Sequence, residues 1–183
     1  MDMNALMSAL LSSDSIDSIS RQAGVSEEET RQVLSSALPQ MLSGAQGQAT
    51  NEETSESFAK ALSDHAQADT SDVRGFVNAV DLIDGGKILA HLLGAGQTAI
   101  TDSAAASAGL KPAQVVKILS IAAPLLMTLL GKQAGKEDNS ASSVAGLMSA
   151  LLGSSDTSEL VQTLLFGKKK KKKGLLGLLL GGK

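Results

Sequence analysis

The feature that most constrains this fold is the long apolar run at 109–131. Pro112 suits the first turn of a helix, Gly131 is a typical helix end, and Lys117 is the one charged residue between them. A helix that is apolar on almost every face must be enclosed by other helices. Its uncharged part, 118–130, is shorter than the roughly 20 residues that cross a membrane. We therefore predict a buried central helix and not a membrane span.

The composition favours helices along the whole chain. The 183 residues include no Cys, Trp or Tyr and three Phe, so Leu, Ala, Val, Ile and Met must build the core. Strong helix formers dominate, whereas the aromatic residues that strands favour are scarce. Without Cys, disulfides and thiol chemistry are excluded. We expect an all-α, multihelical protein of about nine helices around the central one.

Short-range signals predict several helix boundaries. Gly24 is typical of the residue after a helix, and Ser26 with Glu29 forms a capping box at the next helix start. Small polar residues at 44–51 predict a linker, and the Asp-Gly-Gly sequence at 84–86 predicts a turn. Further helices are expected at 52–65, 97–108, 141–152 and 157–166.

Two segments that lie 85 residues apart resemble each other. Residues 23–25, 33–35, 37 and 39 match residues 108–110, 118–120, 122 and 124 in identity or type. Pro39 and Pro124 are equivalent, and each should kink or break its helix. We predict an internal duplication with halves at about 1–50 and 86–152, joined by 51–85. Together they form one helical domain, 1–166, followed by a low-complexity tail, 167–183.

Charge is distributed unevenly between these two parts. The tail holds seven lysines and no acid, which leaves nine basic residues against 19 acidic ones in 1–166, a net charge of −10. An acidic body repels nucleic acid and anionic membranes. A short cationic block can bind either of these, or the acidic body of another copy.

One segment, 19–34, resembles a helix-turn-helix, a DNA-binding arrangement. Its second helix begins with Glu27, Glu28 and Glu29, where a helix that approaches phosphates and bases needs Lys or Arg. We therefore expect a packing corner at this position and regard nucleic acid as an unfavoured partner.

The candidate metal ligands are His65 and His91, with Asp64, Asp81 and Asp84 nearby in sequence. Their spacing matches no compact ligand pattern. The sequence also shows no nucleophile elbow and no complete phosphate-binding loop. We expect no enzymatic activity, no metal or other cofactor, and no small-molecule substrate.

The tail contains the candidate contact residues. One hypothesis is an anchor on an anionic membrane surface. A second is that its leucines dock into a groove on another subunit while its lysines face that acidic body. A third is a low-complexity end without a fixed partner. The candidate residues are Lys168, Lys169, Lys170, Lys171, Lys172, Lys173, Leu175, Leu176, Leu178, Leu179 and Leu180.

Three motifs resemble the bacterial family known as domain of unknown function 937, which is related to the YidB-like proteins. They are AGVSEEETRQVLSSALPQML from Ala23, DGGKILAHLLG from Asp84, and GLKPAQVVKILSIAAPLLMTLLGKQA from Gly109. The resemblance covers roughly 3–152. It implies a multihelical fold in bacteria, with no established activity and no catalytic residues. The six-lysine block departs from the pattern of similar proteins.

These observations predict a cytoplasmic, non-enzymatic protein that self-associates as a homo-oligomer. Asp2 stands where a secretory signal needs positive charge. The leucine-rich segments 87–94 and 141–152 are expected to supply apolar surface for an interface. A peripheral membrane or envelope-associated protein, anchored by 168–180, is the first alternative. A DNA-binding protein is the second.

Overall fold

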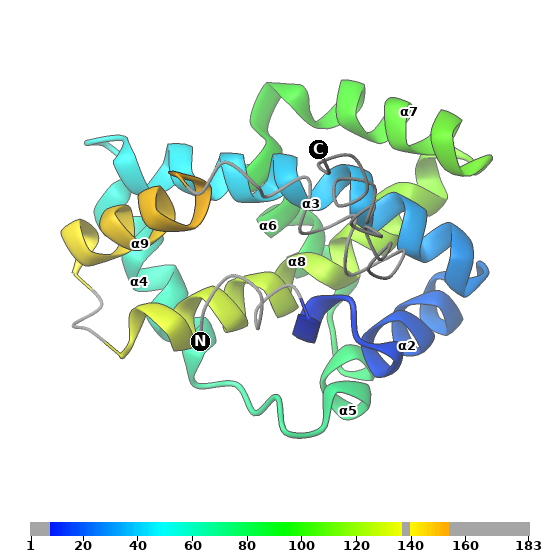
Figure 1. The fold of residues 1–183 in the computed structure, drawn as a ribbon, viewed down its shortest axis with the longest axis horizontal. Coiled ribbons are helices and arrows are strands. Elements are labelled where there is room, and N and C mark those ends of the chain that lie inside the picture. Colours follow the sequence, from blue (N-terminus) through cyan, green and yellow to red (C-terminus); the bar gives the residue numbers. More distant parts are fainter. Residues whose placement is uncertain (1–7, 137–139, 154–183) are drawn as a thin grey trace, which may run out of the picture.

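The computed structural model describes residues 8–136 and 140–153, and every regular element in these ranges is helical (Figure 1). The all-α prediction is confirmed. The predicted helix at 157–166 and the tail lie outside the described residues. The eight α-helices that are described, with one short 3-10 turn, are α2 (Ser13–Ala23), α3 (Glu27–Thr50), α4 (Ser55–Ala66), α5 (Val73–Asn78), α6 (Leu82–Leu93), η1 (Gly94–Gly96), α7 (Gln97–Ala108), α8 (Pro112–Ala134) and α9 (Ala141–Gly153).

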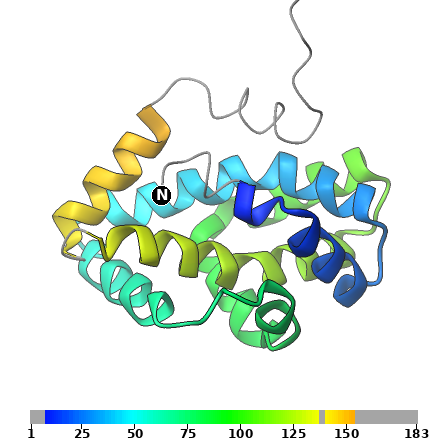
Figure 2. The same cartoon turned by 60° about the horizontal axis from the view of Figure 1, so that its bottom comes forward.

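Helix α8 lies among the other helices and contacts α2, α3, α4, α6 and α7 (Figures 1 and 2). All side chains from Ile118 to Gly131 are buried. The helix is long and apolar enough to cross a membrane, but 78% of its most apolar window is buried inside the fold. Its apolar faces are therefore covered by protein. The helix continues past Gly131, the predicted end, to Ala134.

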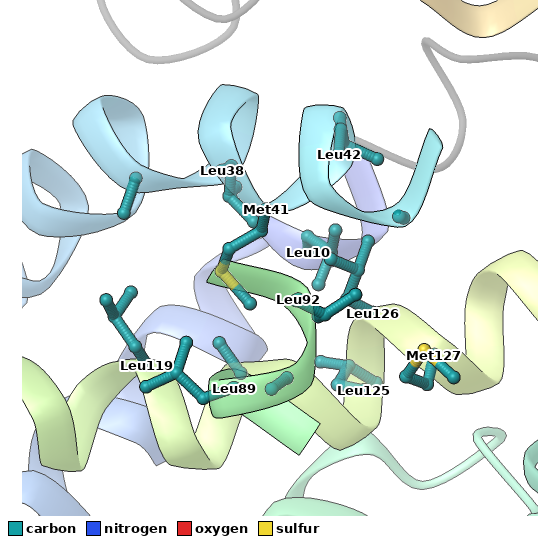
Figure 3. Packing of buried hydrophobic residues seen from close by; sticks show 14 of the residues in the cluster. Leu10, Leu38, Met41, Leu42, Leu89, Leu92, Leu119, Leu125, Leu126 and Met127 are labelled. Carbon is teal, nitrogen blue, oxygen red and sulfur yellow. The ribbon is translucent and has the colours of Figure 1, made fainter. Parts of the chain in front are cut away.

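The core contains a layer of side chains between α3 and α8, with α6 inserted between these two long helices (Figure 3). Met41 from α3, Leu89 from α6 and Leu126 from α8 are each fully buried. Leu92 and Leu93 of α6 are buried as well. The expectation that 87–94 offers apolar surface to a partner is therefore wrong, because α6 uses its leucines inside its own chain.

Two predicted helix interruptions are wrong. Helix α3 continues without a break through Pro39 and through most of the predicted linker at 44–51. Helix α6 begins at Leu82, where the Asp81 side chain accepts a hydrogen bond from the Ile83 amide at 2.8 Å. The predicted turn at 84–86 therefore lies inside α6. Pro124 likewise lies within an uninterrupted α8.

Close helix crossings explain why glycines occur inside these helices. An added Cβ at Gly44 would collide with the carbonyl oxygen of Leu92, where α3 crosses α6. The same substitution at Gly85 would collide with the carbonyl oxygen of Ser120, where α6 crosses α8. These glycines allow the two backbones to approach closely, and they do not end their helices.

The start of α3 has the predicted capping box. The Ser26 hydroxyl accepts a hydrogen bond from the Glu29 amide at 3.2 Å, and the Glu29 carboxylate accepts one from the Ser26 amide at 2.7 Å. This second bond, from the Ser26 backbone, holds the pKa of Glu29 below its ordinary value. Gly24, with φ of 76°, ends α2 as predicted.

The helix pair α7–α8 repeats this local geometry 85 residues later. Gly109, with φ of 68°, ends α7 as Gly24 ends α2. The Lys111 amide donates to the Gln114 side chain at 3.1 Å, at the positions equivalent to Ser26 and Glu29. The helices that follow each pair are exchanged, because α4 contacts α8 and α9 contacts α3.

Candidate functional site

An apolar groove of about 240 Å³ lies between α4 and α6 and is partly open to solvent. The end of α3 and the middle of α8 complete its walls. Its lining residues are Gln48, Thr54, Ser57, Phe58, Ala61, His65, Ile88, His91, Leu92 and Met127.

The spacing of residues along α4 builds one wall of this groove. Ser57, Ala61 and His65 recur every four residues and therefore share one helix face. Phe58 and Leu62, on the adjacent face, are buried in the core. The helix thus presents small and polar side chains to the groove while its large apolar residues hold it against α8.

The opposite wall comes from α6, and its position is fixed by a contact to α3. The Gln48 side chain donates a hydrogen bond to the His91 backbone oxygen at 2.9 Å. Ile88 lies one turn before His91 and faces the same groove. Met127 of α8 is buried, with 3% of its surface exposed. The groove therefore has an apolar interior, with a rim that includes polar groups.

The two histidines of the chain line this one groove from different helices. The three aspartates that were considered with them, Asp64, Asp81 and Asp84, do not line it. The described part of the chain contains no group of three or more His, Cys, Asp or Glu that could hold a metal ion. Two imidazoles are fewer protein ligands than catalytic or structural zinc uses.

Ser57 is the hydroxyl in the groove that stands on the same helix face as a histidine. Its Oγ donates a hydrogen bond to the Thr54 backbone oxygen at 2.8 Å. That hydroxyl proton is therefore engaged within the first turn of α4, and the serine is held as a structural group at the helix start.

Carboxylates flank the groove along α4 and the residues before it. Glu52, Glu53, Glu56 and Asp64 are all exposed. Lys60, the one basic residue among them, pairs with Asp64 at 2.9 Å. Glu53 and Glu56 directly precede the groove residues Thr54 and Ser57 in the sequence. The groove therefore lies beside a surface with an excess of negative charge.

The start of α3 is also acidic, at the helix that a helix-turn-helix would present to DNA. Glu27 and Glu28 are exposed, and Arg31 pairs with Glu28 at 3.6 Å. Glu29 is engaged in the capping box. This surface favours no contact with phosphates.

The most exposed large apolar residues of the described chain are at the start of α6. Ile83 is 73% exposed and Leu82 is 37% exposed. The sequence analysis missed them because the predicted turn began immediately after them. The predicted contact residues of the tail, 168–173 and 175–180, lie outside the described residues, so their role stays a prediction.

A family described as bacterial protein of unknown function (DUF937) matches residues 5–133. The chain belongs to this family. The match includes every residue that lines the groove and ends near the end of α8. It is shorter than the range of 3–152 expected for this DUF937 protein, because it leaves out α9. No curated protein and no solved structure matches the DUF937 chain.

Proposed function

We propose that this DUF937 protein is a non-enzymatic interaction module that associates with further copies of itself. The observation that carries the proposal is the opposite charge of its two parts. The helical body, 1–166, has a net charge of −10, and the tail, 167–183, carries seven lysines. Opposite charges on separate parts of one chain favour contact between copies, the tail of one against the body of the next.

The distribution of apolar residues supports association through the tail more than through a broad helix face. In the described residues, Leu82 and Ile83 are the large apolar side chains that are exposed. Stable protein interfaces bury about 800 Å² per partner, which two exposed side chains do not provide. The five leucines of the tail add apolar surface that can be buried between copies.

The size and chemistry of the groove support a non-enzymatic role. Its volume of about 240 Å³ is below the roughly 300–1,000 Å³ of pockets that enclose whole small molecules. The Ser57 hydroxyl bonds to the backbone, and no third charged group joins the two histidines in the lining. A groove of this kind suits a few apolar side chains of a protein partner.

The paired helix geometry supports an internal duplication, in which α2–α4 and α7–α9 descend from one unit. The glycine ends, the caps of the long helices and the internal prolines recur 85 residues apart. In this arrangement each half packs its third helix on the long helix of the other half. The ancestral unit would then have buried its apolar surface against a second copy of itself, as an interaction module does.

Light scattering of the full chain and of a chain that ends at Leu165 tests this proposal. Circular dichroism confirms that both are folded. We expect the full chain to exceed the monomer mass of 18.6 kDa and the shortened chain to match its own monomer mass. Monomers in both samples would refute self-association. A full chain that is monomeric but floats with anionic vesicles would assign the tail to a membrane surface instead.

A further inference from the structure

We infer that the groove between α4 and α6 is the receptor for the tail leucines, 175–180, of a second copy. This inference rests on the proposed function and names the site through which the copies associate. Three features of the chain support it: the chemistry of the groove, the charge beside it, and the place where the tail leaves the body.

The groove matches leucine side chains in chemistry and size. Ile88, Leu92 and Met127 give it apolar walls. Its volume of about 240 Å³ suits a few aliphatic side chains and is small for a whole organic ligand. The tail offers leucines in pairs and triplets separated by glycine, without bulky neighbours. Glycine lets a short segment approach a groove wall closely.

The charge beside the groove matches the lysines that precede these leucines. Glu53 and Glu56 are exposed next to the groove residues of α4. The six lysines, 168–173, end one residue before the first glycine–leucine unit. When the leucines occupy the groove, the lysines therefore come within a few residues of these carboxylates. Such pairs fix the direction of the docked segment and raise its association rate.

The exit point of the tail favours a neighbouring copy. The C-terminal end of α9 points away from α4 (Figure 2). Twenty-one residues separate Gly153 from Leu175, and an extended chain of this length spans at most about 70 Å. Either groove is within that reach, but the chain must turn back on its own body to occupy its own groove. Occupation of the chain's own groove is the competing outcome of the test.

Docking of a tail in a groove joins two different surfaces, so the association is head-to-tail. Head-to-tail contacts generate rings or open chains that grow beyond dimers. A variant that keeps the tail but loses the groove can still supply a tail to another chain. A variant that keeps the groove but loses the tail can still receive one. A mixture of the two therefore forms one contact and stops at a dimer.

The test uses full-length variants and light scattering. Ser57→Arg and Ala61→Arg place bulk and positive charge in the groove. Ala106→Arg, at an exposed position of α7, is the matched control with the same charge change. In the tail variant, serine replaces Leu175, Leu176, Leu178, Leu179 and Leu180. Circular dichroism checks that each variant is folded.

We expect both groove variants and the tail variant to associate at least tenfold more weakly than the wild-type chain, while Ala106→Arg behaves as wild type. An equimolar mixture of Ser57→Arg and the tail variant should form dimers. If the groove variants associate normally and the tail variant does not, the tail docks elsewhere; self-association then stands and this inference fails. A mixture that stays monomeric, as docking within one chain requires, overturns it too. A monomeric wild-type chain would refute the proposed function itself.

Discussion

Glycines inside the helices mark the places where two backbones touch. At Gly131 an added Cβ would collide with the Leu62 carbonyl oxygen, where α8 crosses α4. Gly44 and Gly85 occupy equivalent places at the crossings of α6 with α3 and α8. A body built with few aromatic side chains gains much of its packing from such close approach, because the contacts of small residues bring whole helix faces together.

Gly85 and Gly86 provide a matched pair that tests this account. Alanine is the better helix former by about 1 kcal/mol, so without a clash both substitutions would stabilise α6. Gly85→Ala should instead lower the free energy of unfolding by about 1–3 kcal/mol, because α6 must move away from Ser120. Gly86→Ala meets only the Ser120 hydroxyl at 3.7 Å and should be neutral or stabilising. Urea unfolding measures both; equal effects would argue against the crossing.

The capping box at Ser26 gives α3 a defined acid dependence. The pKa of Glu29 is lowered from 4.5, chiefly because the Ser26 amide donates to its carboxylate. A lowered pKa in the folded state means that the carboxylate stabilises the fold above its ordinary pKa. This contribution is lost as the pH falls through the lowered value. Glu29→Gln should therefore be less stable than wild type at neutral pH.

The difference in unfolding free energy between wild type and Glu29→Gln should shrink below about pH 4.5 and vanish in stronger acid. Denaturant unfolding at a series of pH values measures it. Glu27→Gln, in the same helical turn but outside the capping box, is the control and should change the acid dependence less. A Glu29→Gln difference that is constant with pH would contradict the assigned role of the carboxylate.

The glycines also show what a local sequence pattern can and cannot specify. Gly24, Gly94 and Gly109 end helices where the sequence predicts it, because their positive φ suits a helix end and depends on local geometry alone. Gly44 and Gly85 were interpreted as linker and turn signals, and both lie inside helices. Their reason is a second backbone that is distant in sequence, which a local pattern does not contain.

At the scale of elements, burial predicts a hierarchy of local stability. Fourteen consecutive residues of α8, 118–131, are buried, whereas Val77 is the one buried residue of the six-residue α5. We expect the α8 amides to exchange hydrogen at the rate of global unfolding and the α5 amides to exchange much faster through local opening. Native-state hydrogen exchange measures this. Equal protection of both helices would contradict the arrangement.

Helix α9 lies beyond the family match but is part of the packed body. Val144 and Met148 are fully buried where α9 contacts α3 and α4. Met148→Ala should therefore lower the unfolding free energy by about 2–5 kcal/mol, as truncations of buried side chains do. Ser149→Ala, at an exposed neighbouring position, is the control and should have little effect. An unchanged stability in Met148→Ala would show that α9 does not belong to the cooperative unit.

Most elements could be predicted because their signals are local. The apolar run of α8, the capping box of α3 and the periodic pattern of α7 each lie within one stretch of sequence. The role of α6 was not predicted, because its leucines are buried only when α3 and α8 lie on its two sides. Packing between distant elements decides which apolar residues become surface.

At the scale of the molecule, the groove was beyond a sequence-based prediction. His65 and His91 were grouped with three aspartates because all five are close in sequence, and the fold brings together only the histidines. The remaining walls come from α3 and α8, far away along the chain. The charge difference between body and tail, in contrast, is a property of composition and could be read directly.

Salt provides the most direct test of self-association between the acidic body and the cationic tail. Screening shortens the range of electrostatic attraction from about 10 Å at 0.1 M salt to about 3 Å at 1 M. Light scattering of the full chain should give a mass well above 18.6 kDa at 0.1 M salt and a mass that falls toward 18.6 kDa at 1 M. A mass of 18.6 kDa at both salt concentrations would contradict self-association, and a larger mass that does not change with salt would contradict its electrostatic origin.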